Sequence, residues 1–302
     1  MNSPGSHDPG TLRSVHPRSI RIPAADGLTL HALEWSREGI ALLLLHGFGN
    51  EAHIWDDIAP ALAEHYRVLA LDWRGHGDSD HDPEARYDYP NHLADLEAVC
   101  DALALDRVVL VGHSLGGRVA TLFAGRHPGR MAGLAILDSG PELDLRGTLR
   151  IGLDMERDPE PSFASVAEYE AALAHAYPAA AESALRRMAE HGLRSRDDGR
   201  YAPKLDPAYR EARGRLSPEA QRNREEELSR TLWSALESVS CPALVIRGAA
   251  SDILSAEVAD RMVGEALAQG TLRVVGQAGH SVMVDNPEAC RTALEAFALG
   301  EE

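Results

Sequence analysis

The sequence predicts an α/β fold, a doubly wound and mostly parallel β-sheet with helices on both faces. Short, unbroken apolar runs bounded by glycine and proline alternate along the chain with segments of helical periodicity. Unbroken apolar strands are typical of a sheet that is covered on both sides. The chain has 302 residues, 44% of them hydrophobic, which is enough for one large domain with an insertion, or for two domains at most.

The order of the expected elements follows from these runs. Two alternating runs flank Asp26 and Gly27, a pair that favours a hairpin between antiparallel edge strands. The expected strands lie at 19–23, 28–35, 40–45, 68–71, 108–111, 134–137, 244–246 and 272–275. The expected helices of this region lie at 55–65, 91–104, 115–126, 256–267 and 287–299. Residues 1–17 are rich in Ser, Pro, Gly and His and lack an apolar signal core, which predicts a flexible arm.

Residues 142–236 interrupt this alternation. They are dense in Arg, Glu, Asp and Ala, contain no strong strand, and have helical stretches at 166–176, 183–191 and 218–236. Their charge is nearly balanced, with 18 acidic and 15 basic residues, whereas the rest of the chain has 29 acidic and 15 basic residues. This predicts a helical cap over the carboxyl edge of the sheet, inserted between core segments 18–141 and 237–302. A solvated peripheral helical bundle is the alternative.

The bulk composition disfavours several classes of function. The net charge of −17 repels phosphate backbones and anionic membrane surfaces, so neither nucleic acid nor membrane is an expected partner. The three cysteines form no disulfide framework and no metal-binding spacing, which favours free thiols in a reducing compartment. We therefore expect a cytoplasmic monomer or homodimer that acts on a small molecule.

The sequence Gly-His-Ser-Leu-Gly at 112–116 is the strongest catalytic signal. It contains the G-x-S-x-G pattern directly after an expected strand and directly before an expected helix. A serine on such a sharp turn has a strained backbone, and side chains larger than those of the flanking glycines would clash. The pattern predicts Ser114 as the nucleophile. It also predicts that the N–H of Leu115, at the helix N-terminus, stabilises an oxyanion.

A second oxyanion donor is expected from His-Gly-Phe-Gly at 46–49, which follows the strand 40–45. A loop at that position can aim a backbone N–H at the reaction centre, most simply the N–H of Phe48. The ring of Phe48 is also expected to contact the substrate. His46 is predicted to be structural, bonding the loop backbone, rather than catalytic.

His280 is the predicted general base, because a histidine in a loop after the last strand can reach a serine on a neighbouring strand. Two aspartates that follow strands fit the chain order Ser, Asp, His. Asp252 is favoured as the acid that orients the imidazole, because it lies in a polar loop after a strand, 28 residues before the base. Asp138 is the alternative, although it could instead support the exit of the chain into the cap.

Together these motifs resemble those of the α/β-hydrolase superfamily over essentially the whole chain after the arm. The segment Asp-Trp-Arg-Gly-His-Gly-Asp-Ser at 72–79 resembles the family's D-x-R-G-x-G-x-S segment, and Asp252 and His280 match its acid after strand seven and its base. The resemblance implies an eight-stranded sheet with the cap inserted after strand six. Residues 198–207 resemble a segment common in lids of this superfamily, which makes Tyr201 a candidate substrate-binding residue.

No cofactor and no metal are expected. The acidic and histidine side chains between positions 72 and 82 lack the H-x-H-x-D-H spacing of metallo-hydrolases, and Gly75 and Gly77 suit a tight loop instead. The sequence has no G-x-x-x-x-G-K-[ST] or G-x-G-x-x-G motif, so a nucleotide cofactor has no support.

The sequence thus predicts a serine hydrolase that cleaves a small, largely apolar carboxylic ester or related acyl compound through an acyl-enzyme. Serine at position 114 disfavours the epoxide hydrolases and haloalkane dehalogenases of this superfamily, which use Asp there. Lactonases, thioesterases, carbon–carbon bond hydrolases and cofactor-free haloperoxidases stay open. A small-molecule receptor of the same fold that turns over slowly also stays open.

Overall fold

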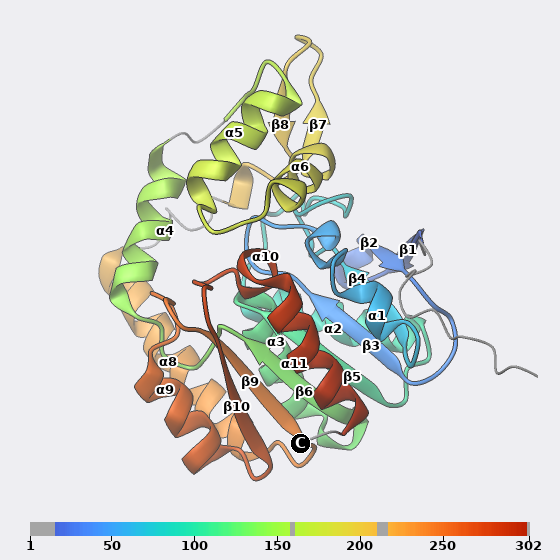
Figure 1. Ribbon diagram of the computed structural model, residues 1–302, viewed down its shortest axis with the longest axis vertical. Coiled ribbons are helices and arrows are strands. Elements are labelled where there is room, and N and C mark those ends of the chain that lie inside the picture. Colours follow the sequence, from blue (N-terminus) through green and yellow to red (C-terminus); the bar gives the residue numbers. More distant parts are fainter. Residues whose placement is uncertain (1–15, 158–160, 210–216, 301–302) are drawn as a thin grey trace, which may run out of the picture.

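The computed structural model describes residues 16–157, 161–209 and 217–300 (Figure 1). Almost all of the expected N-terminal arm, 1–17, lies outside these ranges. An eight-stranded sheet forms the centre, with the strand order β1-β2-β4-β3-β5-β6-β9-β10. The pairs β1·β2 and β2·β4 are antiparallel and the others are parallel, which confirms the expected fold class. The strands are β1 (Arg18–Pro23), β2 (Thr29–Glu34), β3 (Ala41–Leu45), β4 (Arg67–Leu71), β5 (Val108–His113), β6 (Met131–Leu137), β9 (Ala243–Gly248) and β10 (Gly270–Val275).

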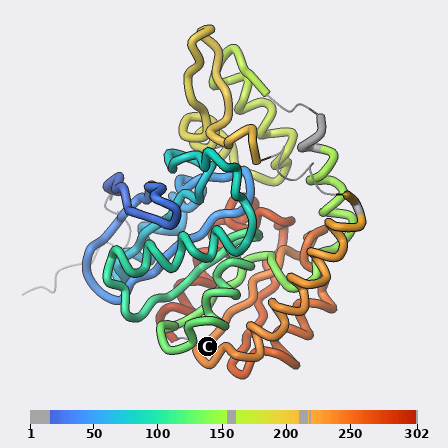
Figure 2. The backbone as a smooth tube through the Cα atoms, turned by 180° about the vertical axis from the view of Figure 1, so that it is seen from behind, coloured from blue at the N-terminus to red at the C-terminus, as the bar shows by residue number. Residues whose placement is uncertain are grey.

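The unbroken apolar runs are explained by two cores, one on each face of the sheet. In β3, Leu43 and Leu45 pack in one core with Phe123 of α3, whereas Leu42 and Leu44 pack in the other with Leu294 of α11. Figure 1 shows α11 in front of the sheet, and Figure 2 shows α2 on the opposite face. The helices packed on this core include α1 (Ala59–Leu62), α2 (Tyr89–Ala102), α3 (Leu115–Arg126), α9 (Ala256–Arg261), α10 (Val282–Asp285) and α11 (Pro287–Leu299).

Most elements of the core match the expectation, and two differ from it. The hairpin at Asp26 and Gly27 is confirmed, since both residues have positive φ and the turn joins β1 to β2. The helix expected over 55–65 is wrong, because the chain forms the short 3₁₀-helix η2 (Ala52–Trp55) and a single turn, α1, with Pro60 in its first positions. The helix expected over 256–267 ends at Arg261 and continues as a π-turn, η4 (Met262–Ala266). The remaining 3₁₀-helices are η1 (Ala25–Gly27) and η3 (Pro128–Arg130).

The segment between β6 and β9 contains helices and a small hairpin. The three helices expected at 166–176, 183–191 and 218–236 are confirmed, whereas α4 and the hairpin β7–β8 were not expected. In Figures 1 and 2, α5, α6 and the hairpin stand beyond the edge of the sheet. By contrast, α8 packs along α3, with Leu232 and Leu236 buried, so the last part of the expected cap, 142–236, belongs to the core. The elements are α4 (Leu145–Arg157), α5 (Val166–Ala176), α6 (Glu182–His191), β7 (Leu193–Ser195), β8 (Tyr201–Pro203) and α8 (Pro218–Glu237).

Within the described ranges, no helix is both long enough and apolar enough to cross a membrane.

Candidate active site

Ser114 is the single residue between β5 and α3. Its backbone has φ 51° and ψ −114°, a conformation that is costly for any residue with a side chain. The turn is held by the segment that follows the neighbouring strand β6, because the Ser139 hydroxyl donates a hydrogen bond of 2.7 Å to the Ser114 carbonyl. The strained strand-to-helix turn expected from the sequence is therefore present.

The glycines of this turn are required by close packing. A Cβ atom at Gly116 would overlap the carbonyl oxygen of Leu45 in β3, and one at Gly112 would overlap the carbonyl oxygen of Gly116. Contact with β3 is possible only because position 116 has no side chain. The first turn of α3 is thereby set against the end of β3.

The loop after β3 lies against the nucleophile. A Cβ atom at Gly47 would lie 3.1 Å from the Cβ of Ser114, so the next residue, Phe48, is close to the reaction centre. Leu115 is the first residue of α3, and its N–H therefore has no acceptor within the helix. Of the two residues expected to supply oxyanion donors, Leu115 directly follows Ser114 in the chain and Phe48 directly follows the glycine that packs against it.

His46 has the structural role expected for it. Its Nδ1 donates to the Gly47 carbonyl at 2.7 Å, and its Nε2 accepts from the Trp73 N–H at 3.2 Å. The ring is fully buried, and this burial lowers the pKa of His46. A neutral ring with both nitrogens occupied fixes the loop and leaves no nitrogen for catalysis.

His280 reaches the site from the loop after β10, and Asp138 is its acidic partner. The Nδ1 of His280 lies 2.8 Å from Oδ2 of Asp138, with the aspartate side chain fully buried. Asp138 also accepts hydrogen bonds from the Gly248 N–H at 3.0 Å and from the Ser251 hydroxyl at 2.6 Å. A carboxylate held by three donors orients the imidazole and balances a positive charge on it.

The prediction that Asp252 contacts the imidazole is wrong. Its carboxylate is bound by the Arg150 guanidinium, with N···O distances of 2.7 and 2.9 Å, and this bond lowers the pKa of Asp252. The reason lies in the sheet order: β6 is the direct neighbour of β5, and Asp138 is the first residue after β6. Asp252 lies four residues beyond the end of β9, in a loop that turns toward α4.

A second histidine, His113, contacts the backbone of His280. No sequence motif predicted this contact. The Nε2 of His113 donates to the carbonyl of His280 at 2.9 Å, and the two rings lie 4.6 Å apart. Burial and the proximity of His280 lower the pKa of His113 well below its usual value. His113 therefore remains neutral and holds the backbone of the base. Its place directly before the nucleophile was the only signal in the sequence.

Aromatic side chains from the segment between β6 and β9 approach this site. Tyr177 donates a hydrogen bond of 3.3 Å to the Asn50 side chain, and the Tyr209 ring lies 4.9 Å from that of Phe48. Tyr201, expected near the substrate, lies in β8, where its backbone pairs with Ser195 of β7 on one side and with Phe163 on the other. Figure 1 shows this hairpin beyond the edge of the sheet. Tyr177 and Tyr209 thus contact loops of the core.

The loop over 72–82 forms a tight internal support, as its glycines predicted. Gly75 and Gly77 have φ angles of 72° and 53°, which suit residues without a side chain. The Asp72 carboxylate accepts hydrogen bonds from the Ala52 N–H at 2.7 Å and the Asp78 N–H at 2.9 Å. It thereby joins this loop to the loop that follows β3.

Comparison with known proteins agrees with this architecture. Residues 40–287 match the family described as alpha/beta hydrolase fold. The chain is similar to the 2-(acetamidomethylene)succinate hydrolase of Mesorhizobium japonicum, with 28% identity over 76% of this chain and 77% of that protein. It is also similar to an esterase of Mycobacterium tuberculosis, with 27% identity over 86% of this chain and 83% of that protein.

Other matches are shorter or purely structural. An uncharacterised protein of Mycobacterium tuberculosis is 37% identical over 43% of this chain, but the match spans only 37% of that protein's length. The crystal structure of an alpha/beta hydrolase from Novosphingobium aromaticivorans superposes with a TM-score of 0.79 and 28% identity, covering 94% of this chain and 99% of that chain. With the family match extending over most of its length and the sheet in the matching topology, this chain belongs to the α/β-hydrolase superfamily.

Proposed function

We propose that this chain is a serine hydrolase that cleaves a small, largely apolar carboxylic ester or a related acyl compound. Ser114 is the nucleophile, His280 the general base and Asp138 the acid that orients it. The observation that carries the proposal is the 2.8 Å contact between His280 Nδ1 and the buried Asp138. The Asp138 carboxylate can only accept a hydrogen bond, so the Nδ1 of His280 carries the proton. Its Nε2 is then the nitrogen that can accept a proton from Ser114.

The reaction then has two halves. His280 takes the proton of the Ser114 hydroxyl as its oxygen attacks the acyl carbon, and the N–H groups of Phe48 and Leu115 stabilise the oxyanion. The imidazolium returns the proton to the departing alkoxide, which leaves an acyl group on Ser114. In the second half, His280 activates water, which attacks the acyl carbon and releases the acid and the free serine.

The preference for an apolar acyl group is supported by the surroundings of the nucleophile. The half-buried ring of Phe48 packs on Tyr209 and on His76, and Tyr177 contacts the loop that follows β3. The similarity to an esterase supports ester cleavage. The similarity to 2-(acetamidomethylene)succinate hydrolase makes that compound a useful test substrate.

Active-site labelling tests the proposal. We expect a fluorophosphonate probe to label the protein at Ser114, and Ser114→Ala to lose both the label and at least about 10³-fold in turnover. Ser165→Ala, which removes the cap of α5, is the matched control and should keep both. Undiminished turnover in Ser114→Ala would exclude a serine mechanism.

A substrate panel addresses the bond that is cleaved. Turnover would be compared on neutral acyl esters, thioesters, lactones, a carbon–carbon substrate and 2-(acetamidomethylene)succinate. We expect the highest kcat/KM on a neutral ester, with steady turnover after any acyl burst. A stoichiometric burst without further turnover on the whole panel would favour a receptor instead.

A further inference from the structure

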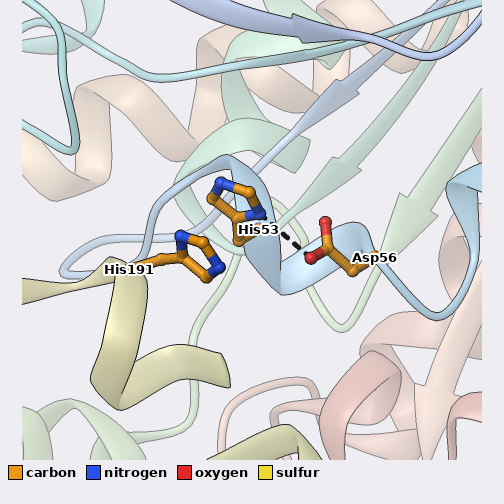
Figure 3. A group of neighbouring side chains, drawn as sticks. All are labelled: His53, Asp56 and His191. Carbon is orange, nitrogen blue, oxygen red and sulfur yellow. Dashed lines mark hydrogen bonds and ion pairs between the residues drawn. The ribbon is translucent and has the colours of Figure 1, made fainter. Parts of the chain in front are cut away.

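Three metal-binding side chains meet where the cap contacts the core. His53 lies in η2 and Asp56 directly follows it, whereas His191 is the last residue of α6. Figure 3 shows the two imidazole rings facing one another, with the Asp56 carboxylate beside His53. All three side chains are half-buried, so a dissolved ion can reach them. None of the three belongs to the catalytic group proposed above.

The spacing of their ligand atoms is close to that of a metal site. The Nδ1 of His53 lies 3.0 Å from Oδ2 of Asp56. The rings of His53 and His191 are stacked, with centroids 3.5 Å apart and planes 15° from parallel. One ligand atom from each residue lies within 4.8 Å of the other two. Ligand atoms on a tetrahedral zinc ion, bound at about 2.0–2.2 Å, are roughly 3.3 Å apart. Because imidazole lone pairs lie in the ring plane, the His191 side chain must leave the stacked arrangement before both rings can bind the same ion.

The charges around the group also suit a cation. Two basic side chains lie nearby. Arg187 pairs with Asp57 and its Nε also lies 4.0 Å from Oδ2 of Asp56, and Lys204 pairs with Asp78 at 2.7 Å. Each therefore keeps a carboxylate partner when Asp56 binds an ion. The Oδ1 atom of Asp56 is buried and has no hydrogen-bond partner among the described residues. A buried carboxylate oxygen without a donor is costly, and a bound cation beside this carboxylate would offset that cost.

We propose that His53, Asp56 and His191 bind a divalent transition-metal ion of the zinc class, with water completing the coordination. Two imidazoles and one carboxylate favour zinc, nickel or cobalt over magnesium and calcium. Because η2 belongs to the core and α6 to the cap, the bound ion fastens the cap helix to the core. This inference does not depend on the proposed hydrolase activity, and it assigns the ion no part in the hydrolytic reaction.

Zinc titration of the full chain, after treatment with EDTA and its removal, tests the site by calorimetry and by thermal unfolding. We expect the wild-type chain to bind one zinc ion. The variants His53→Gln, His191→Gln and Asp56→Asn should each bind zinc at least about tenfold more weakly. At a zinc concentration of about 100 times Kd, the wild-type Tm should rise by roughly 5 °C. Magnesium at the same concentration should leave the Tm unchanged.

His175→Gln provides the matched control, because His175 is an exposed histidine on α5 of the same cap. It should keep the wild-type zinc stoichiometry and Tm shift. The proposal is overturned if the three cluster variants keep the wild-type shift, or if His175→Gln loses it to the same degree. Should circular dichroism show that His53→Gln does not fold, His191→Gln on the cap side decides the question.

Discussion

At the scale of single residues, the main determinant of the site is which carboxylate faces the base. Asp138 is fully buried, and its two oxygens accept hydrogen bonds from His280, Ser251 and Gly248. An amide in its place could not accept all three, because its nitrogen is a donor. Asp252 has a different partner, since it forms a partly exposed ion pair with Arg150. Exposed pairs of this kind contribute little to stability.

We therefore expect Asp138→Asn to lower kcat by about 10⁴-fold, because the imidazole loses its correct tautomer and orientation. Asp252→Asn should lower kcat by less than about tenfold. Turnover of both variants on one neutral ester, with circular dichroism as the check on folding, measures the difference. A larger loss in Asp252→Asn would mean that the acid comes from the loop after β9.

At the scale of elements, the geometry of the nucleophile depends on how α3 meets β3. Gly116 lies in the first turn of α3 and packs against the Leu45 carbonyl, which is the last one of β3. The loop that follows β3 contains Phe48, directly after Gly47, which packs against Ser114. Any separation of these two elements would move the Leu115 and Phe48 N–H groups apart and weaken the oxyanion site.

Gly116→Ala should therefore reduce both activity and stability. We expect a loss of about 1–3 kcal/mol in the free energy of unfolding, since a methyl group is forced into a packed contact. The fall in kcat should be at least about tenfold. Gly152→Ala in α4 is the control, because its new methyl group would meet no atom within 4 Å. This change should be neutral or stabilising, by up to about 1 kcal/mol. Denaturant unfolding and ester turnover measure both effects, and equal behaviour of the two variants would refute the packing argument.

At the scale of the whole molecule, the net charge of −17 affects which substrates approach the site. The negative charge is concentrated in the part of the chain outside residues 142–236. That part has 29 acidic and 15 basic residues. A field of one sign changes the local concentration of a charged ligand, and salt screens it over a Debye length of about 10 Å at 0.1 M.

Neutral esters should thus have a higher kcat/KM than dianionic esters of matched size at low salt. The ratio should shrink as sodium chloride is raised, because screening weakens the repulsion. Steady-state kinetics at several ionic strengths would measure it. A preference for the dianion would instead indicate a local clamp, for which Arg150, with a side chain 47% exposed, is the first residue to test.

The sequence by itself determined the fold class and much of the machinery, because these depend on local signals. Apolar runs without polar interruption predict strands that are covered on both faces, as β3 is. Helices α3, α5 and α11 begin and end where their periodicity predicts. The glycines around Ser114 predict a strained turn, since steric exclusion at one position depends on the residue type there.

Only the tertiary structure decided which residues far apart in the chain meet. Asp138 and Asp252 both follow strands in the correct order, and the neighbour relation between β5 and β6 brings only Asp138 to His280. The meeting of His53 with His191 depends on how α6 packs against η2. Such contacts arise from strand order and helix packing. A residue and its neighbours in the sequence are compatible with several distant contact partners, so no local pattern specifies which one is met.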